Sequence, residues 1–115
     1  MRRNRWVFLF AFCFLAASFL RTQVVITSSI VGTVSDPQSA VVEGATVTLT
    51  NVDTGVRWTK TTTASGDYQF PNLIAGHYKV EVFKEGFART VSTDVALENG
   101  TKQRVNFGLK MGKAT

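Results

Sequence analysis

Histidine and cysteine, the side chains most often used in catalysis and metal binding, are almost absent from this sequence. The 115 residues include one histidine, His77, and one cysteine, Cys13. A zinc site needs three or four ligands, and a serine or cysteine nucleophile needs an adjacent base. The sequence therefore predicts no catalytic residue, no cofactor site and no metal site, and we expect no enzymatic activity. His77 follows a turn, where we expect a solvent-exposed side chain rather than a ligand.

Excess charge of one sign is also scarce once the amino terminus is set apart. The formal net charge is +5, from 13 basic and 8 acidic residues. Arg2, Arg3 and Arg5 precede an apolar run and are expected to leave with it, so 13 − 3 = 10 basic residues remain against 8 acidic ones, or +2. These charges alternate in sign along the strands, whereas nucleic-acid binding needs a clustered basic stripe. We therefore expect no nucleic-acid partner.

The sequence has only one long apolar run, and this run is too short to span a membrane comfortably. Residues 6–20 are uncharged and follow the cationic start, as in a secretory signal, whereas a membrane span takes about 20 residues. We predict a helical signal peptide over residues 1–22, cleaved after Ser18, with an uncleaved anchor as the alternative. The protein is then exported, to the periplasm, outer membrane or cell surface. Cys13 leaves with the signal, so no disulfide is expected in the mature chain.

Helical periodicity is missing from the rest of the chain. In residues 44–87, apolar residues such as Val47 and Leu49 alternate with polar ones such as Thr46 and Thr48, which is the period of a strand. Strands are predicted over residues 23–34, 45–51, 56–63, 68–70, 77–83, 88–97 and 102–109. This spacing predicts an all-β antiparallel sandwich or barrel over residues 23–110, followed by a tail at 111–115.

Several details of these strands follow from the same patterns. Gly32 marks a place where its strand is kinked or closely approached by another part of the chain. Residues 71–76 are predicted to form a loop after Pro71, with Leu73 tucked beneath it. One face of the strand at 88–97 is predicted to carry Val91, Thr93, Val95 and Leu97, and the final strand is predicted to turn Val105, Phe107 and Leu109 inward.

Four aspartates are the remaining candidates for binding a metal ion. Calcium takes six to eight oxygen ligands, and carboxylates supply many of them. Asp36, Asp53, Asp67 and Asp94 lie in separate parts of the chain, without the dense D-x-D-x-D pattern of a calcium loop. We favour a role in turns over a role as calcium ligands.

Six short motifs, in order along the chain, resemble one known family. They are Ile30-x-Gly32-x-Val34-x-Asp36, Gly44-Ala-Thr-Val47, Asn51-x-x-Thr54-Gly55, Ser65-Gly-Asp-Tyr68-x-Phe70, Leu73-x-Ala-Gly76-x-Tyr78 and Gly86-Phe87. Together they resemble the carboxypeptidase regulatory-like domain, from Val25 to Leu109. The resemblance implies a seven-stranded antiparallel β-sandwich of the transthyretin-like, carbohydrate-binding-like type. The chain departs from the family pattern at residues 37–39 and 63–64, which changes turn detail rather than the fold.

The resemblance also implies an accessory domain without catalysis of its own. Such domains occur beside metallocarboxypeptidase catalytic domains, in bacterial surface proteins and at the amino terminus of TonB-dependent outer-membrane receptors. A signal followed directly by this domain is similar to the last group. We therefore expect an interaction domain of such a receptor, or a fragment of one. It would contact other cell-envelope domains and reach the outer membrane only through a downstream barrel.

Two less favoured functions remain beside this one. A transthyretin-like hydroxyisourate hydrolase is the weaker alternative. The resemblance implies that such an enzyme has a site built from several histidines, and this chain has one histidine. A stand-alone carbohydrate-binding module of the cell envelope is the stronger alternative, because the fold resembles that group and because Trp58 is present.

Trp58 and Phe83 are the candidate contact residues. Trp58 shares a strand face with Val56 and Lys60 beside a run of threonines, where it can stack on a sugar ring or enter an interface with a partner. Packing at the edge of the sandwich is the alternative for this side chain. Phe83 is out of phase with the apolar residues of its strand and is predicted to be exposed. We expect the two aromatics to form one binding patch.

Overall fold

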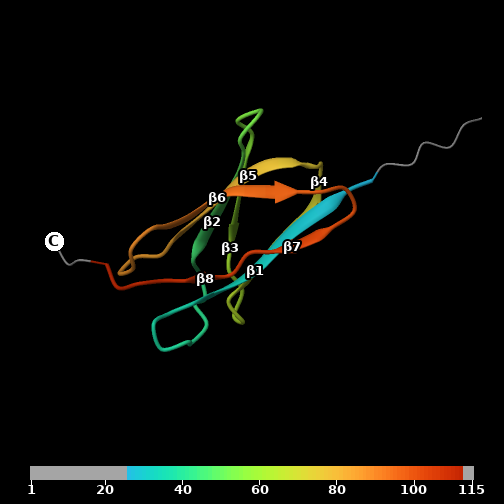
Figure 1. Cartoon of the computed structure of the whole chain (residues 1–115). Coiled ribbons are helices and arrows are strands. Elements are labelled where there is room, and N and C mark those ends of the chain that lie inside the picture. Colours follow the sequence, from blue (N-terminus) through green and yellow to red (C-terminus); the bar gives the residue numbers. More distant parts are fainter. Residues whose placement is uncertain (1–25, 113–115) are drawn as a thin grey trace, which may run out of the picture.

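Two β-sheets packed face to face make up the described part of the chain (Figure 1). The computed structural model describes residues 26–112, and these form eight strands without a helix. The strands are β1 (Ser28–Ser35), β2 (Thr46–Asn51), β3 (Arg57–Thr61), β4 (Asp67–Leu73), β5 (Gly76–Phe83), β6 (Thr90–Leu97), β7 (Lys102–Arg104) and β8 (Phe107–Gly108). The predicted all-β sandwich is confirmed, with eight strands where seven were predicted.

The predicted signal peptide at 1–22, with its cleavage after Ser18, lies outside the described residues. Within residues 26–112 there is no helix of the length and apolar character that crossing a membrane requires. The predicted tail at 111–115 is described only to Gly112, and Met111 forms an antiparallel bridge with Phe87.

The first sheet is organised around β1. Its order is β4-β1-β7, and β8 pairs with the far end of β1. β4 runs antiparallel to β1, whereas β7 and β8 run parallel to it, so the prediction of a purely antiparallel sandwich is wrong at this edge. The predicted single strand at 102–109 is split because Asn106 turns aside. Its side-chain Oδ1 accepts the Thr33 N–H at 2.9 Å, in place of a backbone acceptor.

The second sheet has the order β3-β2-β5-β6, and every pair in it is antiparallel. Val47 and Leu49 of β2 are fully buried, while Thr46 and Thr48 face outward. In β5 the same alternation buries Tyr78, Val80 and Val82. The predicted strand period is confirmed here, since direct partners across β2 and β5, such as Leu49 and Val80, lie on the same face.

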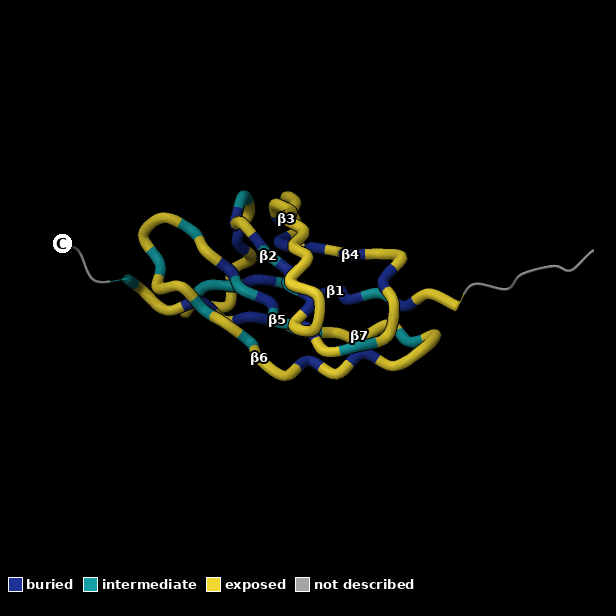
Figure 2. The backbone as a smooth tube through the Cα atoms, turned by 90° about the horizontal axis from the view of Figure 1, so that it is seen from above, coloured by how far each residue is buried: buried dark blue, intermediate teal, exposed yellow. Residues whose placement is uncertain are grey.

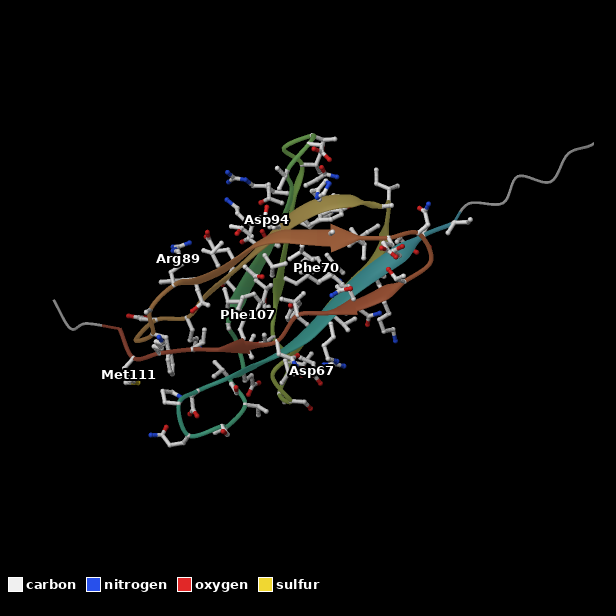
Figure 3. The ribbon with its side chains drawn as sticks, viewed as in Figure 1. Asp67, Phe70, Arg89, Asp94, Phe107 and Met111 are labelled. Atoms are coloured by element: carbon white, nitrogen blue, oxygen red, sulfur yellow. The ribbon has the colours of Figure 1, made fainter. Side chains whose placement is uncertain are left out.

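The core lies between the two sheets (Figure 2). The first sheet contributes Phe70 and Phe107, which lie on the ribbon facing the second sheet in Figure 3. Leu73, Phe107 and Leu109 are buried as predicted, and Val105 is partly buried against the core. Each fully buried valine or leucine stabilises the fold by about 1.5–3 kcal/mol relative to an exposed one.

A bulge in β6 overturns the prediction that four of its side chains share one face. Tyr78 pairs with Val95, but Val80 pairs with Ser92, so β6 carries one residue more than β5 in this interval. Asp94 takes a positive φ of 59° there. Because of this extra residue, the side chains on the two sides of the bulge do not follow one alternation between the faces of the sheet. Val95 is buried, as is Leu97, but Val91 is exposed.

A second bulge corrects the predicted loop at 71–76. β4 continues through Pro71 to Leu73, and the register with β1 shifts between Phe70 and Leu73. Asn72 takes a positive φ of 58° in this shift. Proline is tolerated because β4 is an edge strand, where one side of the backbone needs no donor. The turn to β5 is therefore shorter than predicted, at Ile74 and Ala75.

Candidate functional site

Two hollows lie where the edge strands β3 and β4 meet. Each of these strands pairs with one neighbour only, β3 with β2 and β4 with β1. We call the first hollow the apolar cleft; its volume is about 260 Å³, and it is lined by Asn51, Thr54, Val56, Trp58, Asn72, Leu73, Ile74 and Tyr78. We call the second the basic groove; its volume is about 420 Å³, and it is lined by Val31, Gly32, Lys60, Thr61, Thr63, Asp67, Tyr68, Gln69, Lys102 and Arg104.

Trp58 forms one wall of the apolar cleft. It pairs with Leu49 and so lies on the inner face of the second sheet, at its open edge. Its ring packs against Tyr78, with centroids 6.4 Å apart and planes inclined by 46°. The alternative of edge packing therefore describes its position, yet 38% of the residue is exposed. Trp58 is both anchored and accessible.

Exposed aliphatic side chains complete the rim of the apolar cleft. Ile74 is 62% exposed and Val56 is 48% exposed, and both line the same hollow as Trp58. The hydroxyl of Tyr78 donates a hydrogen bond to the Ile74 carbonyl at 2.7 Å, which holds the β4–β5 turn over the ring. An accessible apolar surface gathered in one hollow is typical of a contact site.

The polar groups of the apolar cleft are fixed by the neighbouring turn. The Asn51 Oδ1 accepts the N–H groups of Asp53 and Thr54, at 2.9 and 3.1 Å. Burial raises the pKa of Tyr78 above its usual value of 10.0, so its hydroxyl stays protonated and donates. The described residues of this cleft therefore offer a binding surface without a group that exchanges protons near neutral pH.

Phe83 lies elsewhere. It pairs with Thr46 on the outer face of the second sheet, whereas Trp58 lies on the inner face. It is 41% exposed, as predicted, and the guanidinium of Arg89 lies 4.8 Å from its ring centroid. Arg89, labelled in Figure 3, also forms an ion pair with Glu81. The prediction that the two aromatics form one patch is wrong, because their partners on β2, Thr46 and Leu49, lie on opposite faces of the strand.

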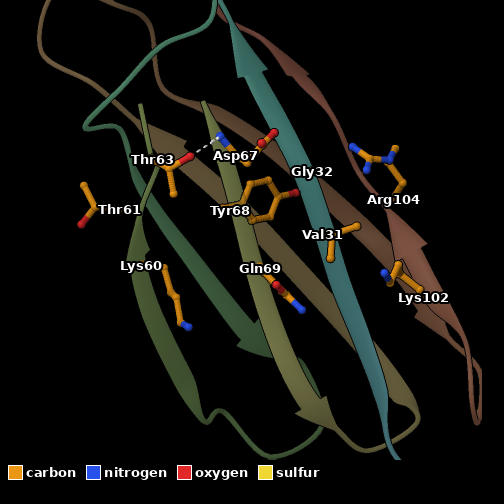
Figure 4. A pocket seen from close by; sticks show the side chains of 10 residues that line it. All are labelled: Val31, Gly32, Lys60, Thr61, Thr63, Asp67, Tyr68, Gln69, Lys102 and Arg104. Carbon is orange, nitrogen blue, oxygen red and sulfur yellow. Dashed lines mark hydrogen bonds between the residues drawn. The ribbon is translucent and has the colours of Figure 1, made fainter. Parts of the chain in front are cut away.

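The basic groove runs over the outer face of the first sheet (Figure 4). Val31 lies at its centre, with Gln69 of β4 on one side and Arg104 of β7 on the other. Lys102 follows the same face of β7, and Lys60 reaches in from β3 of the other sheet. Lys102 and Arg104 are close in the sequence, and the fold adds Lys60 from another strand to the same groove, which corrects the expectation that charge is not clustered.

A glycine and a tyrosine hold the backbone beneath the basic groove. A Cβ on Gly32 would lie 1.9 Å from the Val105 carbonyl oxygen and 2.6 Å from the Tyr68 ring, so the predicted close approach is confirmed. The Tyr68 hydroxyl donates a hydrogen bond to that same carbonyl. Burial raises the pKa of Tyr68, and the nearby Arg104 only partly opposes this shift. The hydroxyl therefore stays protonated and structural.

The remaining candidate residues lie apart from both sites or have local roles. His77 is exposed, as predicted, and pairs with Ala96. Asp36 accepts the N–H groups of Gln38 and Ala40 in a turn, and Asp67 accepts the Thr33 hydroxyl. Asp94 lies in the β6 bulge, far from Asp67 in Figure 3. Across residues 26–112 no three histidine, cysteine or acidic side chains come together as a metal site would require.

Several solved structures share this fold. The Bacillus anthracis TIE protein matches with a TM-score of 0.63 and 19% identity, over 75% of this chain and 16% of that one. A proposed carbohydrate-binding protein from Bacteroides uniformis matches with a TM-score of 0.59 and 19% identity, over 72% of this chain and 41% of that one. Hydroxyquinol 1,2-dioxygenase from Pseudomonas putida matches with a TM-score of 0.61 at 9% identity, over 78% of this chain and 58% of that one.

At these identities the solved structures share the fold alone. The chain spans less than two thirds of each of the three proteins. None of the curated protein sequences matches it. A family model for the carboxypeptidase regulatory-like domain, in contrast, matches residues 29–110, which include all eight strands except the first residue of β1. The chain therefore belongs to the carboxypeptidase regulatory-like domain family.

Proposed function

We propose that this chain is an exported, non-catalytic contact module of a cell-envelope protein, and that the apolar cleft docks a neighbouring domain of that protein. A TonB-dependent outer-membrane receptor is the proposed parent. The observation that carries the proposal is the apolar cleft itself, where Trp58, Val56 and Ile74 are exposed together. Tryptophan anchors beside aliphatic side chains are enriched at the centres of protein interfaces.

The chemistry of the apolar cleft favours binding of a partner over catalysis. Tyr78, its one titratable lining residue, donates its hydroxyl to the Ile74 carbonyl and is held protonated by burial. Binding at such a surface gains from apolar area removed from water, at about 25 cal/mol per Å² before the costs of association. An interface centred on Trp58 therefore needs no cofactor.

The parent protein is tested by the mass of the native product. An antibody raised against residues 26–112 is applied to fractionated cells of the source organism. We expect a band several times larger than this 12.6 kDa chain, in the outer-membrane fraction. A band at or below the size of the chain, in a soluble fraction, would contradict the receptor assignment.

The docking surface is tested by site-specific crosslinking in the native parent protein. A photoreactive residue at Val56, on the rim of the cleft, is expected to crosslink to a downstream domain of the same polypeptide. The control position is Val91, which is exposed to a similar extent, 44% against 48%, but lies on the outer face of the second sheet. Equal crosslinking from both positions would remove the apolar cleft as the docking surface.

A carbohydrate is the second candidate occupant of the cleft. The half-exposed ring of Trp58 lies in one hollow with the side chains of Asn72 and Thr54, which supply the amide and hydroxyl groups that hydrogen-bond to sugars. The likeness to a proposed carbohydrate-binding protein supports this candidate through the fold. On a glycan array, Trp58→Ala is expected to abolish binding while Phe83→Ala retains it. An array empty for the unaltered domain would end this candidate.

A further inference from the structure

We propose that the basic groove is a second binding site, separate from the apolar cleft, and that it binds an acidic polysaccharide through the carboxylate groups of its sugars. The site lies on the outer face of the first sheet, over Val31, and it combines residues from four strands, β1, β3, β4 and β7 (Figure 4). It does not depend on the contact proposed for Trp58.

The first argument is the charge of the groove. Lys60, Lys102 and Arg104 all line it. Within residues 26–112 the one ion pair is that of Arg89 with Glu81, so none of the three cations has a carboxylate at ion-pair distance. Arg104 donates only to the neutral Asn106 side chain, at 3.3 Å. Cations gathered in a hollow of the surface concentrate the positive potential there and attract an anion.

The one carboxylate in the groove, that of Asp67, forms no ion pair with the groove cations. The Asp67 Oδ1 accepts the Thr33 hydroxyl at 2.7 Å, and the Asp67 N–H is directed at the Thr63 hydroxyl, as the dashed line in Figure 4 shows. Asp67 therefore shapes the start of β4, and its single negative charge is outnumbered by the three cations of the groove. The groove keeps a net positive charge.

The second argument is the floor. Val31 is 9% exposed although its side chain points to the outer face, and it is not part of the hydrophobic core cluster. The neighbouring positions, Gln69 and Arg104, flank it directly. Val31 therefore leaves only a small apolar surface open at the floor, and the polar side chains around it match the hydroxyl rim of a sugar ring. The volume of about 420 Å³ lies within the usual range for small-ligand sites, about 300–1,000 Å³.

The third argument is the mixture of polar groups, which selects a sugar over an acidic peptide. The Gln69 amide and the Thr61 hydroxyl both donate and accept hydrogen bonds, and both residues are exposed in the groove. Sugar hydroxyls also donate and accept, so every such group can find a partner. An acidic peptide carries one backbone N–H donor per residue beside its carboxylates, whereas each sugar ring carries several hydroxyls that both donate and accept. Tyr68, the one aromatic of the groove, is buried and offers no open face on which a nucleic-acid base could stack.

The test is a titration of the full exported chain, which contains residues 26–112, with polygalacturonate as the probe. Lys60→Gln, Lys102→Gln and Arg104→Gln are combined in one groove variant. We expect this variant to bind at least tenfold more weakly than the unaltered protein, because each exposed charge contact contributes a factor of up to about five. Binding is also expected to weaken as the salt concentration rises.

A matched control separates the groove from overall charge. Lys79→Gln, Lys84→Gln and Lys110→Gln remove the same three charges from residues that do not line the groove. This control is expected to bind within about twofold of the unaltered protein. Equal losses in the two triple variants would overturn the proposal, because attraction would then follow net charge alone.

Four further measurements test the proposal independently of the two triple variants. In amide resonance mapping, polygalacturonate is expected to shift Gln69 and Lys102 and leave Phe83 unmoved. Neutral dextran is expected not to bind. Binding of duplex DNA as tight as that of polygalacturonate would overturn the proposal in favour of unselective attraction. Trp58→Ala is expected to leave polygalacturonate binding unchanged, so failure of the docking proposal and failure of this one are distinguishable.

Discussion

The two sheets of this sandwich are held together in different ways. The second sheet joins β2 to β3 and β5 to β6 as antiparallel neighbours along the chain, and its buried residues alternate with exposed ones. The first sheet brings together segments 70 to 73 residues apart, such as Ser28 with Glu98 and Thr33 with Asn106. Its β7 and β8 edge combines short parallel backbone ladders with particular side chains such as Asn106. The difference predicts where a single substitution does the most damage.

Gly32→Ala is expected to have the largest effect, since it removes the close approach on which the first sheet depends. The new Cβ would lie 1.9 Å from the Val105 carbonyl oxygen, and backbone has to move to make room. We expect a loss of about 3 kcal/mol in the free energy of unfolding, at the upper end of overpacking costs. Urea denaturation of the domain measures this loss.

Gly108→Ala is the control for this prediction. It lies in β8 of the same sheet, and a Cβ there would meet no atom within 4 Å. We expect a change of less than about 0.5 kcal/mol. If the two alanine variants were equally stable, the first sheet would not depend on the approach of Val105 to Gly32.

Thr62→Val tests whether the second sheet also depends on a buried side chain. Thr62 is 4% exposed just after β3; its Oγ1 accepts the Ala45 N–H at 2.9 Å and donates to the Val42 carbonyl at 2.7 Å. Valine has the same shape but leaves both backbone groups without this partner. We expect a loss of about 2 kcal/mol, because an unsatisfied buried group costs about 1–3 kcal/mol. Thermal unfolding measures this loss.

Thr61→Val, at the neighbouring last residue of β3, is the matched control. Thr61 is exposed, so its hydroxyl exchanges hydrogen bonds with water, and the expected change is within about 0.5 kcal/mol. A Thr62→Val variant as stable as this control would mean that the hairpin ladder alone holds the second sheet. The contrast between the two sheets would then be sharper than we describe.

Sequence patterns predict the second sheet better than the first for a physical reason. Antiparallel strands of a hairpin display their register locally, through alternation and turn residues such as Gly55. Parallel pairing of β1 with β7 depends on contacts between distant segments and leaves no local mark. The bulges at Asn72 and Asp94 were missed because both residue types are also common in turns, so their identity does not reveal a positive φ within a strand.

The two candidate sites also differ in how far the sequence predicts them. Trp58 is predictable because a tryptophan in a polar strand is conspicuous in the sequence. The surroundings of Trp58 are not predictable, because Ile74 and Asn72 fall in a segment expected to be a loop. The basic groove has a weak local sign, the alternation of Lys102 and Arg104 in a strand with every residue exposed. Lys60 joins them only because the sandwich places the edge of β3 beside β4.

Tyr68→Phe is expected to have a smaller effect than Gly32→Ala or Thr62→Val, and its effect depends on pH. Near neutral pH, losing the hydrogen bond to the Val105 carbonyl costs about 1 kcal/mol. Burial raises the pKa of Tyr68 in the folded state above its usual value of 10.0. Above pH 10 the unfolded chain therefore releases a proton that the folded protein retains, and stability falls as pH rises.

The variant should lack this part of the alkaline decline, while Tyr78, the other tyrosine of the chain, still contributes its own. Urea denaturation of both proteins between pH 8 and pH 11, at about equal ionic strength, compares the two slopes. Lysine titration cancels because every lysine is present in both proteins. Parallel slopes would mean that Tyr68 ionises as freely in the folded protein as in the unfolded chain. If the two proteins were also equally stable at pH 8, the first sheet would be held by the shape of the Tyr68 ring against Gly32, and the buried hydroxyl would contribute nothing to the difference between the sheets.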